Sequence, residues 1–360
     1  MNKRWDKQRH ATTERDTLTD QLALVFLPHS SQTADTTGTI KARTKKNRKL
    51  ITECERLLGA SLRKLSNVQK KKRKRCREER LANFVALRRA EYMEMPKEER
   101  DKLVVLPNDK FYQKRYYAPV VVEKFKLVFL TIPKVACTQW LQLFRRMEGA
   151  SDWKARDHSL PYTPAYNGLK YLTHYNLTEA NRIMTSPEWT RATFVRDSKE
   201  RFLSAYLDKV VNTKNVFIGA CCPLTKDCVS SQTTFENFYN LTETCENEHW
   251  DLQSERFPDR IWQSLNFVGH MESVQEVARR LLEHIGAWEK YASSGWGHNG
   301  TQAIFAESTG QSTASGHATK SRNRLRQYYT PQLEQAVERR FQRDYENPVF
   351  NLQNFSLFDM

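Results

Sequence analysis

The chain has 360 residues, of which 39% are hydrophobic and 28% are charged. This length predicts two domains, or one large α/β domain with a tail, and the composition excludes a membrane bundle and a wholly disordered chain. The early apolar run from Leu22 to Leu27 is six residues long, against the roughly 20 that span a bilayer. We therefore expect either a cytosolic protein or a recorded start that differs from the one that carries a targeting segment.

The net charge of +16 is concentrated in the N-terminal third. Residues 1–110 hold 28 Lys and Arg against 15 Asp and Glu, whereas residues 111–360 hold 30 against 27. A basic balance favours polyanionic partners. Because the remaining 250 residues are close to neutral, chemistry there must come from local groups of residues.

The first third divides into two segments. Residues 1–40 are polar without sustained periodicity, and we expect disorder there. Residues 41–104 place Leu and Ile at helical spacing, so 41–110 is predicted to be a basic helical stem or extension. The run of six basic residues at 70–75 is typical of a solvated helix face, a polyanion-binding patch or a nuclear import tag.

Strands and helices alternate after Pro107. The expected strands are 125–131, 193–195 and 265–269, and the expected helices are 140–147, one from Lys199, 273–285 and one from Pro331 to about 345, capped by Thr330. Residues 292–320 are rich in Gly, Ser and Thr and are predicted to form a mobile loop. The alternation predicts an α/β domain over 111–360 with a mostly parallel central sheet flanked by helices.

The loop after the first strand carries a candidate anion site. It reads TIPKVACTQW at 131–140, so Lys134 and the hydroxyl of Thr138 lie where a helix N-terminus attracts anions. A P-loop binds phosphate in the same way, with a lysine and the N-terminus of a helix, although its glycine pattern GxxxxGK[ST] is absent here. An ordinary turn with one exposed lysine is the alternative.

A second candidate follows the next strand. Arg196 lies at the carboxyl end of that strand, where ligands bind in open α/β sheets, and its guanidinium suits bidentate phosphate contact. Ser204, about two helical turns later, could add a hydroxyl. The alternative for Arg196 is a structural ion pair with Asp197 or Glu200.

Together the two loops resemble the Golgi carbohydrate sulfotransferases, and most closely the chondroitin, dermatan and HNK-1-type enzymes. PKVACTQW at 133–140 is similar to that family's 5′-phosphosulfate loop, and VRDSKERFLSAYLDK at 195–209 to its 3′-phosphate motif. The spacing of 62 residues between Lys134 and Arg196 is also similar. Weaker similarity follows in LNFVGHMES at 265–273 and in 317–337, so the resemblance covers roughly 120 to 355. It implies a P-loop-NTPase-like sulfotransferase fold.

The resemblance also implies a reaction. The sulfuryl group of 3′-phosphoadenosine 5′-phosphosulfate (PAPS) would pass to a hydroxyl of a carbohydrate acceptor, expected to be an acidic glycan, by in-line displacement. Lys134 would stabilise the leaving phosphate as the catalytic cation, so no metal is required. The family's donor-binding residues correspond here to Lys134, Val135, Ala136, Cys137 and Thr138 for the phosphosulfate, to Arg196 and Ser204 for the 3′-phosphate, and to Thr319 and Arg324 in a segment that closes over the nucleotide.

A base must take the acceptor's proton, and histidine is the usual type near neutral pH. His249 resembles a family His-Trp pair and is the first choice, with His158 second. Asp251 or Glu248 could orient His249, or one of them could itself be the base. The family usually has Pro where this chain has Ser198, which we expect to loosen the loop after Arg196.

Cysteines and sequons bear on the compartment. Cys221, Cys222, Cys228 and Cys245 allow three pairings of two bridges, of which the vicinal one is unfavourable, and their spacing makes a poor zinc site. N-glycosylation sequons occur at Asn176, Asn240, Asn299 and Asn354. With the resemblance, these features favour the Golgi lumen and a type II membrane protein whose N-terminal anchor is not visible in this sequence.

Two other functions compete with sulfuryl transfer. The same loops would serve an ATP-dependent P-loop-like kinase, although the glycines and a clear Mg²⁺-holding Asp are missing. A non-enzymatic polyanion binder could act through the basic residues 41–104. No specific nucleic-acid signature is present.

Overall fold

The computed structural model describes residues 54, 56, 66–114, 117–154, 164, 167–213, 221, 233–297, 299–306 and 320–358. The segment 1–40, expected to be disordered, and most of the stem before Ser66 lie outside these residues. Contacts divide the chain into two units, Met1–Pro96 and Lys97–Met360. Within the second unit, Val104 and Val105 donate backbone hydrogen bonds to Asn181. A catalytic domain that starts at residue 111 stays a prediction.

In the first unit, helix α3 spans Asn67–Glu94. Its start is fixed by a capping box, in which Ser66 and Gln69 satisfy each other's backbone N–H groups. A disulfide joins Cys54 to Cys76, a pair that the sequence analysis did not single out. The basic run 70–75 lies in α3, where most of its side chains are exposed, so a helix in this part of the stem is confirmed.

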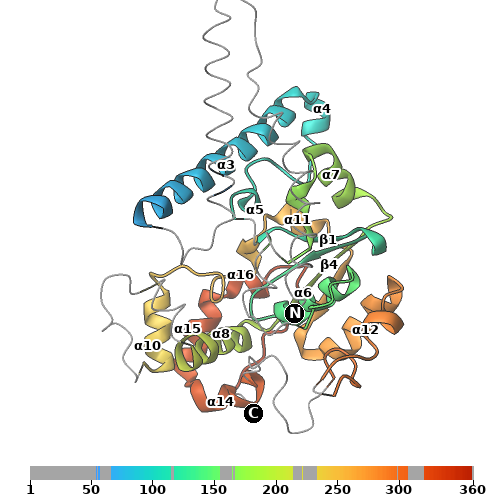
Figure 1. The fold of residues 1–360 in the computed structure, drawn as a ribbon. Helices are drawn as coiled ribbons and strands as arrows, with labels where there is room; N and C mark the ends of the chain where they lie inside the picture. The colour runs from blue at the N-terminus through green and yellow to red at the C-terminus, as the bar shows by residue number, and fades with distance from the viewer. Residues whose placement is uncertain are drawn as a thin grey trace, which may run out of the picture. The chain divides into compact units, whose positions relative to one another are not determined.

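The second unit is built on a five-stranded sheet (Figure 1) in the order β3-β1-β2-β4-β5. Strands β2, β4 and β5 are parallel, and β1 pairs antiparallel with both β2 and β3. The α/β class is confirmed, and the sheet is mixed because two strands that the sequence analysis did not place extend one edge. The strands are β1 (Val120–Val122), β2 (Leu127–Leu130), β3 (Lys170–Tyr171), β4 (Thr190–Val195) and β5 (Phe267–His270).

Helices follow the strands as the alternation predicts. Each parallel connection contains at least one helix, as crossovers between parallel strands require. The helices of this unit are α4 (Lys97–Arg100), α5 (Lys110–Gln113), α6 (Cys137–Met147), α7 (Leu177–Thr185), α8 (Ser198–Tyr206), α10 (Phe235–Thr242), α11 (Asp259–Gln263), α12 (Val274–His284), α13 (Trp288–Tyr291), α14 (Leu325–Tyr328), α15 (Pro331–Arg340) and α16 (Gln342–Tyr345), with a π-helical segment, η5 (Leu207–Asn212), continuing α8.

Aromatic packing fixes α6 against the sheet. The ring of Trp140 lies 4.7 Å from that of Phe129 on β2 and 4.8 Å from that of Phe194 on β4. Gly269 on β5 leaves room for this layer, because a Cβ there would meet the Phe194 ring at 2.4 Å. The start of α6, and with it the loop after β2, is therefore held in place by the core.

A second core lies under α8. Phe202 on α8 contacts Phe238 on α10 and Phe341 after α15 at ring distances of 4.9 and 5.6 Å. Thr330 caps α15 through Leu333 N–H, as the sequence predicts. This packing sets the face that α8 turns toward the loops at the carboxyl ends of the strands.

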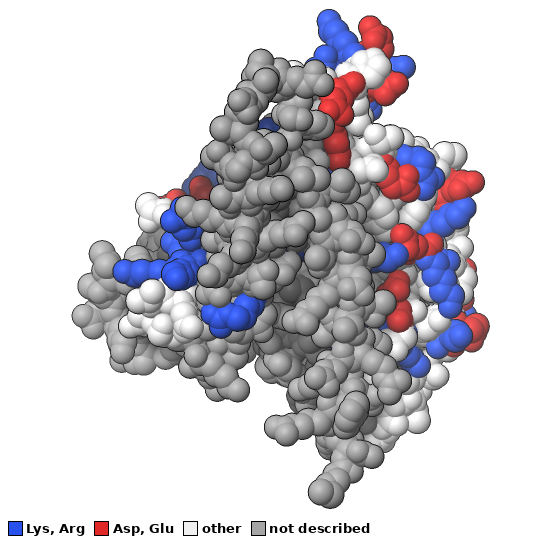
Figure 2. Space-filling model, turned by 45° about the horizontal axis from the view of Figure 1, so that its top comes forward, with Lys and Arg blue, Asp and Glu red and all other residues white. Residues whose placement is uncertain are grey.

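Those carboxyl ends gather at one edge of the sheet, because β2, β4 and β5 run parallel. Lys134 follows β2, Arg196 follows β4 and Glu272 follows β5. Figure 2 shows acidic and basic side chains interspersed over the right of the described surface, with no large area of one sign there.

Candidate functional site

The loop between β2 and α6 has an unusual backbone. Lys134 and Ala136 both have positive φ angles, of 69° and 51°, which residues other than glycine rarely adopt and which cluster at functional sites. Helix α6 begins at Cys137 without a side-chain cap. This end of the helix therefore carries the positive end of its dipole into the loop that holds Lys134.

The Lys134 side chain is buried and paired. Its Nζ lies 2.9 Å from Asp208 Oδ2, with the two side chains 9% and 4% exposed. Burial lowers the pKa of Lys134, and the Asp208 carboxylate opposes that effect. Burial alone would raise the pKa of Asp208, but the ammonium groups of Lys134 and Lys209 hold it well below its usual range.

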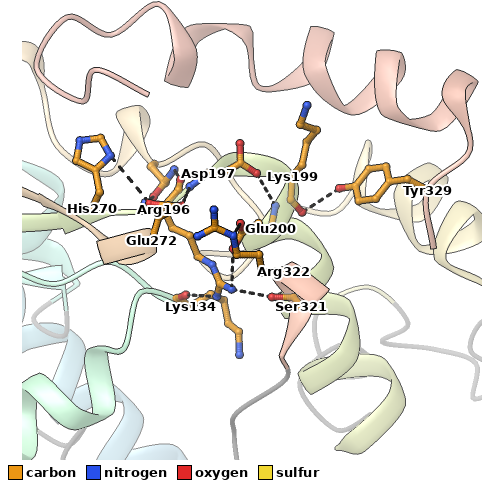
Figure 3. A network of polar contacts seen from close by, with 11 residues as sticks. Lys134, Arg196, Asp197, Lys199, Glu200, His270, Glu272, Ser321, Arg322 and Tyr329 are labelled. Atoms are coloured by element: carbon orange, nitrogen blue, oxygen red, sulfur yellow. Dashed lines mark hydrogen bonds and ion pairs between the residues drawn. The ribbon is translucent and has the colours of Figure 1, made fainter. Parts of the chain in front are cut away.

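Arg196 reaches across to the Lys134 loop (Figure 3). Its Nη1 donates to the Lys134 carbonyl at 3.1 Å, and its Nη2 contacts Ser321 Oγ at 2.7 Å and Glu200 Oε2 at 3.3 Å. The Nε of Arg196 is buried and has no hydrogen-bond partner among the described residues. The two predicted loops therefore meet through the Arg196 guanidinium, which keeps one donor that none of the described residues uses.

Glu200 pairs with two arginines of the site. It ion-pairs with Arg196 and, at 3.5 Å, with Arg322 from the segment Ser321–Arg324. Burial raises the pKa of Glu200, and the two arginines oppose that effect. The ion pair considered as the alternative role for Arg196 is thus present, but it sits inside the site and includes a second arginine.

The backbone of Arg196 is clamped from one side. Gln253 accepts from Arg196 N–H at 3.1 Å and donates to its carbonyl at 2.8 Å. The fully buried Asp344 accepts in turn from Gln253 N–H and from the Ser198 hydroxyl. The Ser198 hydroxyl thus ties the start of α8 to Asp344, while the expected loosening of the loop stays a prediction.

Glu200 and Ser204 are four residues apart in α8 and lie on the same helical face. Ser204 is buried at 3% exposure. Arg196 precedes this helix, and Asp208 lies in the π-helical segment η5 that follows it.

The expected base lies close to Lys134. His249 Nδ1 lies 2.6 Å from Asn247 Oδ1, which also accepts from the His249 backbone N–H. An amide oxygen only accepts hydrogen bonds, so Nδ1 carries the proton and Nε2 is the basic nitrogen. Burial lowers the pKa of His249 well below its ordinary value, and the positive charges of Lys209 and Lys134 lower it further.

Arg324, which stays a predicted donor-binding residue, lies in the C-terminal segment. Arg324 turns to the Tyr328 hydroxyl, 2.5 Å away, while Ser321 and Arg322 contact Arg196 and Glu200. Thr319 and His158 lie outside the described residues, as do Cys222 and Cys228. Cys221 forms its disulfide with Cys245.

Within the described ranges, no group of three or more His, Cys, Asp or Glu side chains could hold a metal ion. No helix in the same ranges is long and apolar enough to cross a membrane.

In a comparison with known protein families, residues 118–351 match the model of the sulfotransferase family. The chain is 31% identical over 118 residues to carbohydrate sulfotransferase 11 of Rattus norvegicus, covering 32% of this chain and 31% of that protein. It is 30% identical over 189 residues to carbohydrate sulfotransferase 11 of Danio rerio, covering 46% of this chain and 52% of that protein. It is 24% identical over 193 residues to human carbohydrate sulfotransferase 9, covering 46% of this chain and 40% of that protein. The matches thus span about a third to a half of the length of these relatives. No solved structure matches.

Proposed function

This chain belongs to the sulfotransferase family, and we propose that it transfers the sulfuryl group of PAPS to a hydroxyl of a carbohydrate acceptor. The observation that carries the proposal is the meeting of two cationic loops, 62 residues apart, at the carboxyl edge of the sheet, where Arg196 Nη1 donates to the Lys134 carbonyl. The carbohydrate sulfotransferases that the chain resembles support the acceptor class.

The residues present fit a donor with two anionic ends. Arg196 has a buried Nε without a partner among the described residues. The Ser321 hydroxyl contacts Arg196 Nη2, and the Arg322 guanidinium pairs with Glu200, which also pairs with Arg196. We assign the 3′-phosphate to this group together with Ser204. Charge-assisted, bidentate contacts of arginine with phosphate compete well with a single carboxylate such as Glu200.

Lys134 and the start of α6 would hold the 5′-phosphosulfate. During transfer the bond between sulfur and the bridging oxygen of the 5′-phosphate breaks, and negative charge develops on that oxygen. The Lys134 ammonium and the backbone N–H groups of residues 135–138 stabilise this charge more in the transition state than in the ground state. Lys134 thereby supplies the cation.

His249 would take the acceptor's proton. Its Nε2 is the basic nitrogen, and its lowered pKa keeps the ring neutral at pH 7. The acceptor oxygen forms its bond to sulfur as His249 receives the proton, and adenosine 3′,5′-bisphosphate leaves. The Asn247 contact fixes the tautomer, so this residue takes the orienting role considered for Asp251 or Glu248.

We also propose an acidic glycan as acceptor and the Golgi lumen as the location. Exposed Lys70, Lys71 and Lys72 on α3 offer cations to such a chain. The disulfides Cys54–Cys76 and Cys221–Cys245 support an oxidising compartment. An N-terminal membrane anchor of type II is part of the same proposal.

The test measures PAPS binding by calorimetry and sulfate transfer to a panel of glycosaminoglycans. Lys134→Ala should lower turnover by about 10²–10³-fold, and Arg196→Ala should weaken binding of the 3′-phosphorylated nucleotide. Arg279→Ala is the matched control, since that side chain pairs with Glu283 on the surface. PAPS binding unchanged in both site variants contradicts the site, and tighter binding of ATP than of PAPS would favour a kinase.

A further inference from the structure

Asp208 is the partner of Lys134, and the pair is shielded from water. The carboxylate is 4% exposed and the ammonium 9%, at 2.9 Å. The two residues come from separate elements, the loop after β2 and η5, 74 residues apart in sequence. A buried pair of this kind breaks at a high cost unless each charge gains another partner.

The helical geometry changes where Asp208 lies. Helix α8 ends at Tyr206 and continues as the π-helical segment Leu207–Asn212, a rare form that is found frequently at functional sites. The same turn carries Lys209, whose Nζ lies 3.0 Å from Asp208 Oδ2. Asp208 therefore holds two ammonium groups at one oxygen.

We propose that Asp208 is a positioning residue that holds Lys134 charged in the donor-free site and releases it to the donor, with Lys209 remaining as its counterion. This inference rests on the proposed function. When Lys134 turns to the anionic phosphosulfate, Asp208 keeps one ammonium partner, so no buried carboxylate is left unpaired. The pair thus lets one lysine exchange partners at low cost.

The charges around Lys134 support this role. Burial lowers its pKa, Asp208 opposes this, Lys209 lowers it and the Cys137 thiol raises it; His249 lies close enough to feel the Lys134 charge. Asp208 is the anion that pairs with the ammonium, at 2.9 Å. Without Asp208 the amine would lose its proton at lower pH, and a neutral amine does not stabilise the leaving phosphate.

The experiment compares pH profiles of sulfate transfer for the full chain and three variants. Asp208→Asn should move the alkaline limb of the pH profile to lower pH. Between the limb of the variant and that of the wild type, the rate of the variant should fall about tenfold per pH unit relative to the wild type. Asp208→Glu should restore most of the limb. Lys209→Gln should move the limb the other way, because a positive charge near Lys134 is lost.

Two further measurements separate this role from a structural one. At a pH below both alkaline limbs, where Lys134 is charged in either chain, adenosine 3′,5′-bisphosphate should bind Asp208→Asn nearly as well as wild type, since Arg196 makes the 3′-phosphate contact. Competitive acetylation of Lys134, followed by mass spectrometry in the donor-free chain, reports its protonation directly. Glu188→Gln, which removes a surface partner of Lys126, is the control and should change neither readout.

The outcomes are distinct. A profile lowered uniformly at all pH values in Asp208→Asn, or an unshifted acetylation curve, overturns the inference. If Asp208→Asn does not fold, the pH profile of Lys209→Gln tests the proposal. An alkaline limb of Lys209→Gln that stays in place or moves to lower pH contradicts it. A wild-type chain that neither binds the bisphosphate nor transfers sulfate contradicts the proposed function instead, while the acetylation curves still test the pair.

Discussion

Lys199 provides a quantitative test of how the site's supporting helix is held. It lies on α8, is fully buried, and its Nζ contacts Glu334 Oε1 at 2.9 Å and Glu338 Oε1 at 2.8 Å. It also donates to Asn354 Oδ1 and to the Phe355 carbonyl. The cluster joins α8 to α15 and to the C-terminal segment.

The expected loss in the free energy of unfolding follows from the burial of Lys199 and Glu334. Lys199→Met keeps the volume of the stem and removes the charge, which leaves Glu334 only 5% exposed and without its cation. Removing one partner of a buried pair costs about 3–5 kcal/mol. Glu334 keeps a hydrogen bond from Leu357 N–H at 2.7 Å, and Glu338 is 26% exposed, so we expect a loss near the lower bound, about 3 kcal/mol.

Urea unfolding followed by tryptophan fluorescence measures this loss. Lys126→Met is the matched control, because Lys126 pairs with Glu188 at the surface and exposed pairs contribute little. The double variant Lys199→Met/Glu334→Leu should recover part of the loss, since the orphaned carboxylate is gone. A loss for Lys199→Met as small as that of the control would refute the reasoning.

Three further predictions concern the site and its frame. Gln253→Ala removes both backbone clamps on Arg196 and should weaken binding of adenosine 3′,5′-bisphosphate about tenfold in calorimetry. The lowered pKa of His249 keeps the ring neutral to more acid pH, so the acid limb of turnover should lie below 6.5, and His249→Gln should lose about 10²-fold or more at pH 7. Cys245→Ser opens the bridge to Cys221, 24 residues away, and should cost about 3 kcal/mol in unfolding, as should reductant; no effect of either would contradict the bridge.

Local patterns predicted much of the fold. The apolar runs at 125–131 and 265–269 became β2 and β5 within a few residues, and Thr330 caps α15 as its sequence indicates. The strands β1 and β3 were missed because they are three and two residues long, too short for an alternating pattern to register. Their pairing is decided by tertiary contact rather than by local preference.

The sequence singled out the two cations as site residues, which stays a prediction, but it did not indicate the side chains that contact them. Lys134 and Arg196 stand at strand ends, which sequence order reveals. Gln253 and Ser321 contact Arg196 from 57 and 125 residues away, and no local signal links such positions. Arg322 contacts Glu200 although its side chain is 60% exposed, and a run of basic residues does not say which of its members makes such a contact.

Isothermal titration of the full chain with adenosine 3′,5′-bisphosphate, beside 5′-AMP and ATP, tests the central claim most directly. Sulfuryl transfer from PAPS predicts tight binding that requires the 3′-phosphate and weakens in Arg196→Ala. Equal binding of the bisphosphate and 5′-AMP by the folded protein, or a preference for ATP, would contradict it.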